Sequence, residues 1–206
     1  METNILLETH PYFITKKIVD MYSSQIKFTF SKYIYIPQTT IDSRINFDID
    51  GNEFSWQKLK ELINSLKKGQ ELSLTSRISF ANGKIFHIPM IDFYTNNFED
   101  IINSLLENLT NEILDNLYIF NSGNSFHAYS TYLLNENDWI KFMARLLLLN
   151  KPLNNCIVDY RWIGHRLLAG YSSLRWSCNT EKSKSYPTLI YSPNRNQKCG
   201  LSEPVQ

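Results

Sequence analysis

Tyr118-Ile-Phe-Asn-Ser-Gly-Asn-Ser-Phe-His-Ala-Tyr129 is the stretch around which the rest of the chain is organised. Two strand-like runs, 117–121 and 126–132, flank the turn-forming run Ser122-Gly-Asn-Ser125, and this pattern predicts a hairpin. A sharp turn that contains glycine leaves backbone N–H groups free, and such concave sites suit anions, especially phosphates. His127 begins the outgoing strand beside these donors. The stretch therefore predicts an anion site next to a histidine.

Aspartates end the apolar runs on either side of this hairpin in the sequence. An apolar run that ends in Asp92 precedes the hairpin, and Cys156-Ile-Val-Asp159 follows it. Ligands of α/β sheets collect beyond the strand ends, so two such carboxylates can converge there on a divalent ion that bridges nucleotide phosphates. The structural alternatives are that Asp92 forms a turn, that Asp159 caps the segment from Tyr160, and that His127 is a half-buried strand residue.

The composition limits the class of protein. With 206 residues and 43% hydrophobic content, the chain can bury a full core, and its length favours one domain. Lys and Arg number 21 against 20 Asp and Glu, which argues against non-specific coating of DNA and confines any nucleic-acid site to a local groove. The three cysteines are widely spaced, which predicts neither disulfides nor a zinc knuckle: Cys156, Cys178 and Cys199. We see no leader and no apolar run of bilayer length, so we expect a cytoplasmic protein without membrane contact.

The periodicity predicts one domain with a small N-terminal α/β unit (1–70), a catalytic-type core (71–192) and a frayed tail (193–206). In the N-terminal unit we expect helices at 11–24 and 54–68, the second stopped by Gly69, and strands at 26–36 and 45–50. Asn82-Gly83 predicts a hairpin between 72–80 and 84–93, whose second strand is an edge or carries a bulge near Pro89. The other expected elements are helices at 97–114, 135–150 and 160–169, and strands at 156–159, 173–176 and 186–191.

Three motifs carry a resemblance to a known family. Pro89-Met-Ile-Asp-Phe-Tyr94, Ser122-Gly-Asn-Ser-Phe-His-Ala-Tyr129 and Cys156-Ile-Val-Asp159 are similar, in this order, to the three signature motifs of the archaeo-eukaryotic primase superfamily. Gly164-His-Arg-Leu-Leu-Ala-Gly-Tyr-Ser-Ser-Leu-Arg-Trp176 resembles the family's region after the third motif. The resemblance extends over residues 72–177, and the second motif is the most specific of the three.

The resemblance implies an α/β fold, α+β in stricter usage, with a mixed, largely antiparallel sheet and an RNA-recognition-like core. It implies a primase-polymerase-like nucleotidyltransferase that adds NTPs or dNTPs to a nucleic-acid chain, with a DNA or RNA template and a helicase or second subunit as partners. Asp92 and Asp159 would be catalytic and hold Mg²⁺ or Mn²⁺. The residues implied in binding the nucleotide, its phosphates or the template are Ser122, Gly123, Ser125, His127, Arg166 and Arg175.

One position departs from the family's pattern, whose first motif has two acids two residues apart. Here Tyr94 takes the place of the second acid, and a neutral phenol supplies neither a metal ligand nor a negative charge. Three alternatives stay open: Glu99 or Asp100 substitutes, one metal suffices, or a catalytically degraded domain binds nucleotides or nucleic acid as a subunit of a replication or defence complex.

Two rival interpretations remain beside this assignment. Asp48-Ile-Asp50 is a literal Asp-x-Asp, but Asp50-Gly51 is typical of a hairpin turn, whereas Asp92 ends a long apolar strand and is preferred. His87 and His165 are expected to be structural, although His165 with Arg166 and Arg175 is also placed to line a phosphate path. A plain interaction module would use an aromatic surface that includes Trp139, Trp162 and Trp176.

Overall fold

The computed structural model of the chain describes residues 7–23, 25–36, 39, 42–152 and 156–193. Within these ranges the chain forms six helices and two sheets, and every strand pair is antiparallel. This arrangement confirms the predicted α+β class. None of the helices in the described ranges combines the length and the apolar character that a membrane crossing requires.

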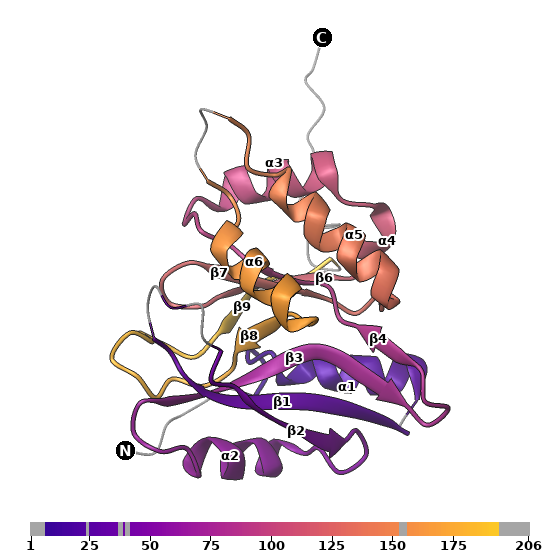
Figure 1. Cartoon of the computed structure of the whole chain (residues 1–206), viewed down its shortest axis with the longest axis vertical. Helices are drawn as coiled ribbons and strands as arrows, with labels where there is room; N and C mark the ends of the chain where they lie inside the picture. The colour runs from indigo at the N-terminus through magenta and orange to yellow at the C-terminus, as the bar shows by residue number, and fades with distance from the viewer. Residues whose placement is uncertain (1–6, 24, 37–38, 40–41, 153–155, 194–206) are drawn as a thin grey trace.

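The first sheet, sheet A, takes its strands from both ends of the chain (Figure 1). Its path runs through β2 (Ile45–Asp50), β1 (Ile26–Ile34), β3 (Gln70–Phe80) and β4 (Ile85–His87), and β8 (Ser173–Arg175) also pairs with β3. Since β1 pairs with β3, the sheet crosses the boundary that was expected at residue 70. The division of the chain at that boundary stays a prediction.

Two N-terminal helices pack on sheet A through short apolar stripes. Helix α1 (Tyr12–Tyr22) buries Ile14 and Ile18, and α2 (Trp56–Asn64) buries Leu59 and Ile63 in the same cluster. Figure 1 shows α2 along the outer side of this sheet. The hydroxyl of Ser55 accepts the Lys58 N–H at 3.1 Å and caps the start of α2. The helix ends at Asn64 rather than at Gly69, which has a φ of 79° in the turn before β3.

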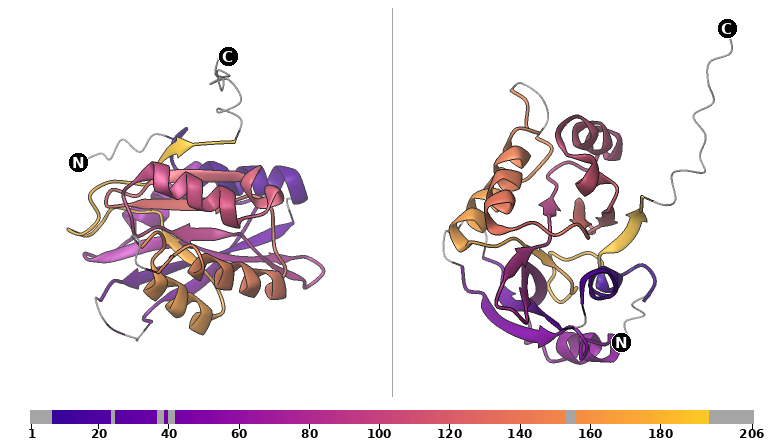
Figure 2. Two further views of the ribbon diagram at one scale, coloured as in Figure 1. Left: turned by 90° about the horizontal axis from the view of Figure 1, so that it is seen from above. Right: turned by 90° about the vertical axis from the view of Figure 1, so that its right-hand side faces the viewer.

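The second sheet, sheet B, contains the central hairpin. Its order is β5 (Met90–Asp92), β7 (Phe126–Ser130), β6 (Leu117–Asn121) and β9 (Thr188–Tyr191), and the pairing of Asn121 with Phe126 confirms the predicted hairpin. Figures 1 and 2 show four helices near this sheet: α3 (Phe98–Asn108), α4 (Asn111–Leu114), α5 (Glu136–Leu147) and α6 (Tyr160–Ala169). These helices supply apolar side chains to a cluster on the sheet. The helix predicted at 97–114 is divided, because Leu109 and Thr110 have extended backbone.

Pro89 marks the point where the chain passes from sheet A to sheet B. A proline has no N–H to donate to a ladder, so a continuous strand cannot keep its full hydrogen bonding through this residue. The predicted strand 84–93 is therefore two short strands, β4 in sheet A and β5 in sheet B. The amide of Ile88 still donates to Ser76 of β3 at 2.8 Å, whereas the carbonyl of Pro89 accepts the Ser130 N–H at 3.0 Å.

Alternate residues of sheet B belong to two separate apolar clusters. One set joins the side chains of sheet A, α1 and α2: Met90, Tyr118, Phe120 and Tyr129. The other set joins the helices: Ile91, Ile119 and Ala128. Successive side chains of a strand point to opposite faces, so Asp92 shares the face of Met90, and His127 shares the face of Tyr129. Both candidate site residues therefore face the layer between the two sheets.

Candidate functional site

Asp92 and His127 stand opposite each other on neighbouring strands. They are Cα partners in the register of β5 and β7, and directly opposed residues of an antiparallel pair present their side chains on one face. The Oδ1 atom of Asp92 lies 3.6 Å from the Nε2 atom of His127. The imidazole is buried, whereas 25% of the Asp92 side chain is exposed. The first and second motifs of the sequence thus meet at one point of sheet B.

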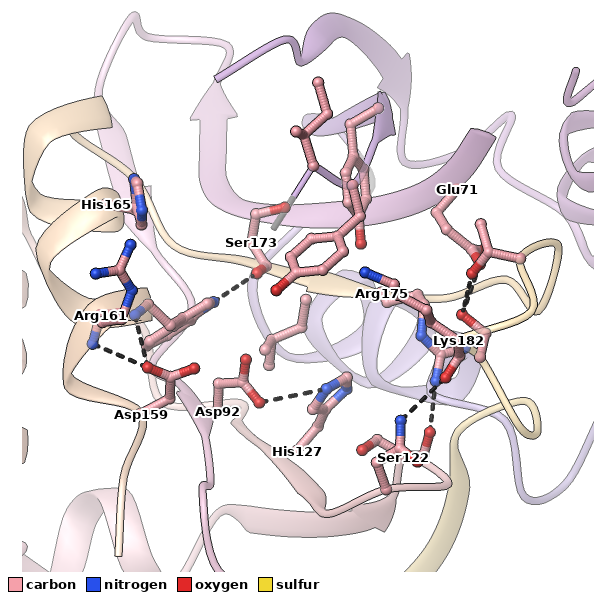
Figure 3. A pocket seen from close by; sticks show the side chains of 18 of the residues that line it. Glu71, Asp92, Ser122, His127, Asp159, Arg161, His165, Ser173, Arg175 and Lys182 are labelled. Atoms are coloured by element: carbon pink, nitrogen blue, oxygen red, sulfur yellow. Dashed lines mark hydrogen bonds and ion pairs between the residues drawn. The ribbon is translucent and has the colours of Figure 1, made fainter. Parts of the chain in front are cut away.

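Asp159 reaches the same point through the backbone of the third motif. Its amide donates to the carbonyl of Asp92 at 3.0 Å, and Phe93 forms an isolated bridge with Val158. The predicted strand 156–159 is reduced to this bridge. Asp159 Oδ1 accepts the backbone N–H groups of Arg161 at 2.8 Å and Trp162 at 3.0 Å, so the helix-cap alternative is confirmed. The carboxyl groups of Asp92 and Asp159 face one another in Figure 3.

A pocket of about 940 Å³ opens over these three residues and is lined from both sheets. Sheet A contributes Tyr33, Glu71 and Arg175, and sheet B contributes Asp92 and His127. Figure 3 shows Asp92 between the α6 side of this pocket and the side that carries Arg175. The basic residues of its lining are Arg44, Arg161, Arg166, Arg175, Lys182 and Lys184. The pocket therefore combines a small acidic centre with several surrounding cations.

The turn between β6 and β7 has fewer free amides than its sequence suggests. The N–H of Ser122 donates to the carbonyl of Ser125 at 2.9 Å, and the N–H of Gly123 donates to Asn121 Oδ1 at 2.8 Å. Gly123 has a φ of 99°, and a Cβ there would lie 3.0 Å from the Ser185 hydroxyl oxygen. Glycine is thus required because the turn packs against the loop before β9.

Arg175 fastens this turn to the same loop. Its guanidinium donates to the carbonyl of Ser122 and to the carbonyls of Ser177 and Ser185, the last at 3.1 Å. Three backbone acceptors from two segments hold one planar cation in place beside His127. Arg175 is therefore preorganised, and its charge contributes to the electrostatics of the pocket.

Glu71 is the residue that holds the loop after β8, and no motif in the sequence indicated it. It is 1% exposed and accepts a hydrogen bond from the Ser177 hydroxyl, and others from Thr180 at 2.8 Å and Ser183 at 2.6 Å. The backbone N–H of Asn179 also donates to it. In the sequence, the only sign of this role is that Glu71 is an acid directly before the apolar run 72–80. Its carboxylate is the common acceptor for residues 177–183.

Burial sets the protonation of the central pair. It raises the pKa of Asp92 to about 8, and the negative charge of Asp159 acts in the same direction. Burial lowers the pKa of His127 to about 3, and the positive charge of Arg175 adds to this effect. A neutral imidazole and a carboxyl group that resists ionisation therefore face each other at pH 7. A bound cation would favour the ionised carboxylate.

Arg166 lies deeper in the pocket wall and pairs with an acid that the sequence did not single out. It is 3% exposed, and its Nη2 donates to Asp42 Oδ2 at 2.9 Å. Asp42 Oδ1 accepts Nη1 of Arg44, also at 2.9 Å. Two guanidinium groups thus share one carboxylate. Asp42 and Arg44 follow a strand in a stretch without a motif, so sequence reasoning missed them.

Tyr94 occupies the position of the missing second acid without closing the pocket. It lines the pocket and is 67% exposed. Glu99 and Asp100 lie in the first turn of α3 and do not line the pocket, so neither replaces the acid there. Asp48 and Asp50 lie on β2, outside the pocket lining, where they bind Thr29 and Lys27. Asp92 is therefore the acid that meets the other motifs.

The remaining candidate residues divide between core and pocket. His87 is buried, bonded to Ser76 at 2.9 Å and stacked on Trp139, as expected for a structural residue. His165 lines the pocket, as the phosphate-path alternative required. Two tryptophans of the suggested aromatic surface are core residues, with Trp139 2% and Trp176 0% exposed. The prediction that these two tryptophans belong to an aromatic interaction surface is therefore wrong.

The fold and the pocket together define an α+β protein with two carboxylates, a histidine and several arginines at one pocket. Three motifs in the expected order meet at a pocket between two antiparallel sheets.

The comparison with protein families makes the assignment specific. Residues 50–188 match the family described as AEP-like, archaeo-eukaryotic primase 1D-like, and the chain belongs to this family. The matched segment extends beyond the resemblance found in the motifs at both ends and includes Asp92, His127, Asp159 and Arg175. No curated protein and no solved structure matches the chain.

Proposed function

We propose that the protein is a nucleotidyltransferase of the primase-polymerase type, which adds nucleotides from NTPs or dNTPs to a nucleic-acid chain. One observation carries the proposal: Asp92, His127 and Asp159, from three separate motifs, line one pocket together with Arg175. Membership of the AEP-like family supports the class of reaction. A DNA or RNA template, and a helicase or second subunit, are the partners that such a reaction would involve.

The acidic centre fits a divalent ion of the kind that accompanies a nucleotide. No group of three or more ligating His, Cys, Asp or Glu side chains occurs among the residues that the structure describes. Mg²⁺, however, is commonly held by one or two carboxylates, with waters and substrate phosphates as its other ligands. Asp92 and Asp159 would hold Mg²⁺ or Mn²⁺ in this way. The ion would supply charge stabilisation at the transferring phosphoryl group.

The histidine side of the pocket suits the triphosphate of the incoming nucleotide. The Nδ1 atom of His127 is buried and has no hydrogen-bond partner within the described part of the chain. Arg175 supplies a fixed positive charge, and Ser125 adds a hydroxyl group at the pocket wall. Ser122 and Gly123 act indirectly in this proposal, because the carbonyl of Ser122 anchors Arg175 and Gly123 permits the close approach of the turn to the loop.

The direct test is synthesis or extension of a labelled primer with Mg²⁺ or Mn²⁺. We expect Asp92→Asn, Asp159→Asn and His127→Ala to lower the rate roughly 100-fold or more, because each removes a group from the reacting centre. Asn caps helices as well as Asp does, so Asp159→Asn preserves the start of α6 while it removes the charge.

Asp115→Asn is the matched control, because Asp115 is exposed and does not line the pocket. Wild-type rates in all three pocket variants would contradict the assignment.

Tyr94 favours a second candidate function, a domain that binds nucleotides without turning them over. It places an exposed phenol where the family's first motif has a second acid. Such a domain would be stabilised by nucleotide, by about 2.7 kcal/mol at a ligand concentration of roughly 100 times Kd, yet would form no polymer. Primer extension by the wild-type protein would exclude this candidate.

A further inference from the structure

The Arg44–Arg166 pair has more hydrogen-bond donors than Asp42 can accept. A guanidinium carries five N–H donors and no acceptor. Asp42 accepts one guanidinium nitrogen from each arginine, and its Oδ1 also accepts the backbone N–H of Arg44 at 3.2 Å. The Nε atom of Arg44 and the Nε and Nη1 atoms of Arg166 are buried and have no hydrogen-bond partner among the residues that the structure describes. A buried donor left in this state carries its full cost of desolvation. The cluster also keeps a net positive charge, because it has two cations and one anion.

Each guanidinium group also contacts the face of a tyrosine ring. The Arg44 guanidinium carbon lies 4.1 Å from the centre of the Tyr33 ring, and that of Arg166 lies 5.9 Å from the Tyr171 ring. The hydroxyl of Tyr171 is bonded in turn to Asn46. Only 4% of the Arg166 side chain is exposed, against 26% for that of Asp42. The carboxylate is therefore the more accessible partner.

The cluster is part of the pocket, and its residues come from other segments than the hairpin turn. Asp42, Arg44 and Arg166 all line the pocket. Figure 3 places Arg161 and His165 of α6 on the side of Asp92 opposite to Arg175. Asp42 and Arg44 also precede residue 50, where the family match begins. They belong to a part of the chain to which the match assigns no role.

We infer that Arg44 and Arg166 form a phosphate-binding subsite in which the carboxylate of Asp42 occupies the position that a phosphate would take. A phosphate presents more oxygen acceptors than a carboxylate, and arginine forks bind it bidentately. It would therefore satisfy donors that Asp42 leaves unpaired. Asp42 competes with this ligand and makes binding weaker and more selective. The inference deepens the proposed function, on which it rests for the source of the phosphate: a nucleotide or a polynucleotide backbone.

The test is a binding measurement in EDTA, so that metal held by Asp92 and Asp159 plays no part. The probes are fluorescein-labelled dT12, ATP and inorganic pyrophosphate. We expect Asp42→Asn to bind at least one probe roughly tenfold more tightly than wild type, a change of about 1.4 kcal/mol. Asp115→Asn, which removes the same charge from an exposed site outside the pocket, should bind as wild type does. A gain with dT12 alone identifies a backbone phosphate, and a gain with ATP and pyrophosphate identifies a nucleotide.

Arg44→Gln is the second substitution of a double-mutant cycle with Asp42→Asn. We choose Arg44 because it is less buried than Arg166, so the protein tolerates its loss more easily. The double variant Asp42→Asn/Arg44→Gln should lose the gain in affinity. Unliganded Asp42→Asn should melt below wild type, and pyrophosphate should raise its Tm by more than it raises that of wild type.

Unchanged or weaker binding in Asp42→Asn, or a gain that survives Arg44→Gln, would overturn the inference. Absence of binding of all three probes to both proteins would overturn it too. Primer extension with Mg²⁺ or Mn²⁺ by the wild-type protein is a separate readout, so the proposed function can stand if the subsite fails.

Discussion

At the scale of single residues, the site depends on where polar side chains fall in the strand alternation. Asp92 and His127 face the layer between the sheets because they are in register with each other and share a face with the buried Met90 and Tyr129. A shift of one residue in either strand would turn the side chain into the apolar cluster on the other face. Tyr94, in the bend that follows β5, also lines the pocket.

Tyr94→Asp tests whether this position limits metal binding. The substitution places a second acid at the pocket, two residues after Asp92, so we expect about tenfold tighter binding of Mn²⁺ and a higher rate of any metal-dependent reaction. Little stability should be lost, because Tyr94 is 67% exposed. Calorimetric titration with Mn²⁺ measures the affinity. Tyr94→Phe is the control and should bind Mn²⁺ as wild type does; equal affinities in the Asp and Phe variants would contradict the prediction.

At the scale of elements, the pocket wall is built from a turn and a loop that stabilise each other. The β6–β7 turn meets the loop before β9 through Gly123 and through Asn124, whose Nδ2 donates to the Lys182 carbonyl at 3.0 Å. Arg175 joins the two segments, and Glu71 orders the loop from sheet A. The loop therefore positions the turn, although it lies about sixty residues away in the sequence.

Glu71→Gln should loosen this loop as a unit. The carboxylate accepts hydrogen bonds only, whereas an amide places N–H groups against donors such as those of Ser183 and Asn179. We expect a loss of about 2–4 kcal/mol in the free energy of unfolding, and faster hydrogen exchange confined to residues 177–185. Denaturant unfolding and exchange measured by mass spectrometry provide the two readouts.

Glu61→Gln is the control for this change, since Glu61 is exposed on α2. An exchange pattern in Glu71→Gln identical to wild type would show that the loop does not depend on the carboxylate.

At the scale of the whole molecule, buried neutral histidines make the fold sensitive to acid. His10 joins the N-terminal segment to the C-terminal half: its Nε2 lies 2.8 Å from the Trp176 carbonyl, and its Nδ1 accepts the Tyr12 N–H at 3.1 Å. Burial lowers the pKa of His10 to about 4, and burial lowers that of His87 to about 4 as well. Each ring is therefore neutral in the folded state over a range of pH where it is protonated in the unfolded chain.

Stability should consequently fall as the pH is lowered from about 6.5 to 4. The unfolded state binds more protons in this window, so the free energy of unfolding decreases with acid, by up to about 3 kcal/mol for His10. Above pH 6.5 both states are neutral at these rings and the contribution is constant. Urea unfolding at several pH values measures the slope. His10→Asn should have a shallower slope by as much as one proton; equal slopes would contradict the prediction.

Local features were predictable from the sequence because their causes are local. The hairpin at residues 117–130 follows from alternation and the Gly123 turn, and the cap at Asp159 follows from a side chain that accepts nearby N–H groups. The order of Asp92, His127 and Asp159 was sufficient to indicate the family. These features need only interactions within a few residues, or a known order of motifs.

Only the tertiary structure decided which distant segments meet. The chain passes from one sheet to the other at Pro89, and each of its two short strands there pairs with a different sheet. Glu71 binds a loop about a hundred residues later in the sequence, and Asp42 binds Arg166 across a similar separation. Such contacts depend on strand register and on the packing of one sheet over another, and these are properties of the folded chain as a whole. The sequence by itself determined the residues available for chemistry, and packing determined which of them share a pocket.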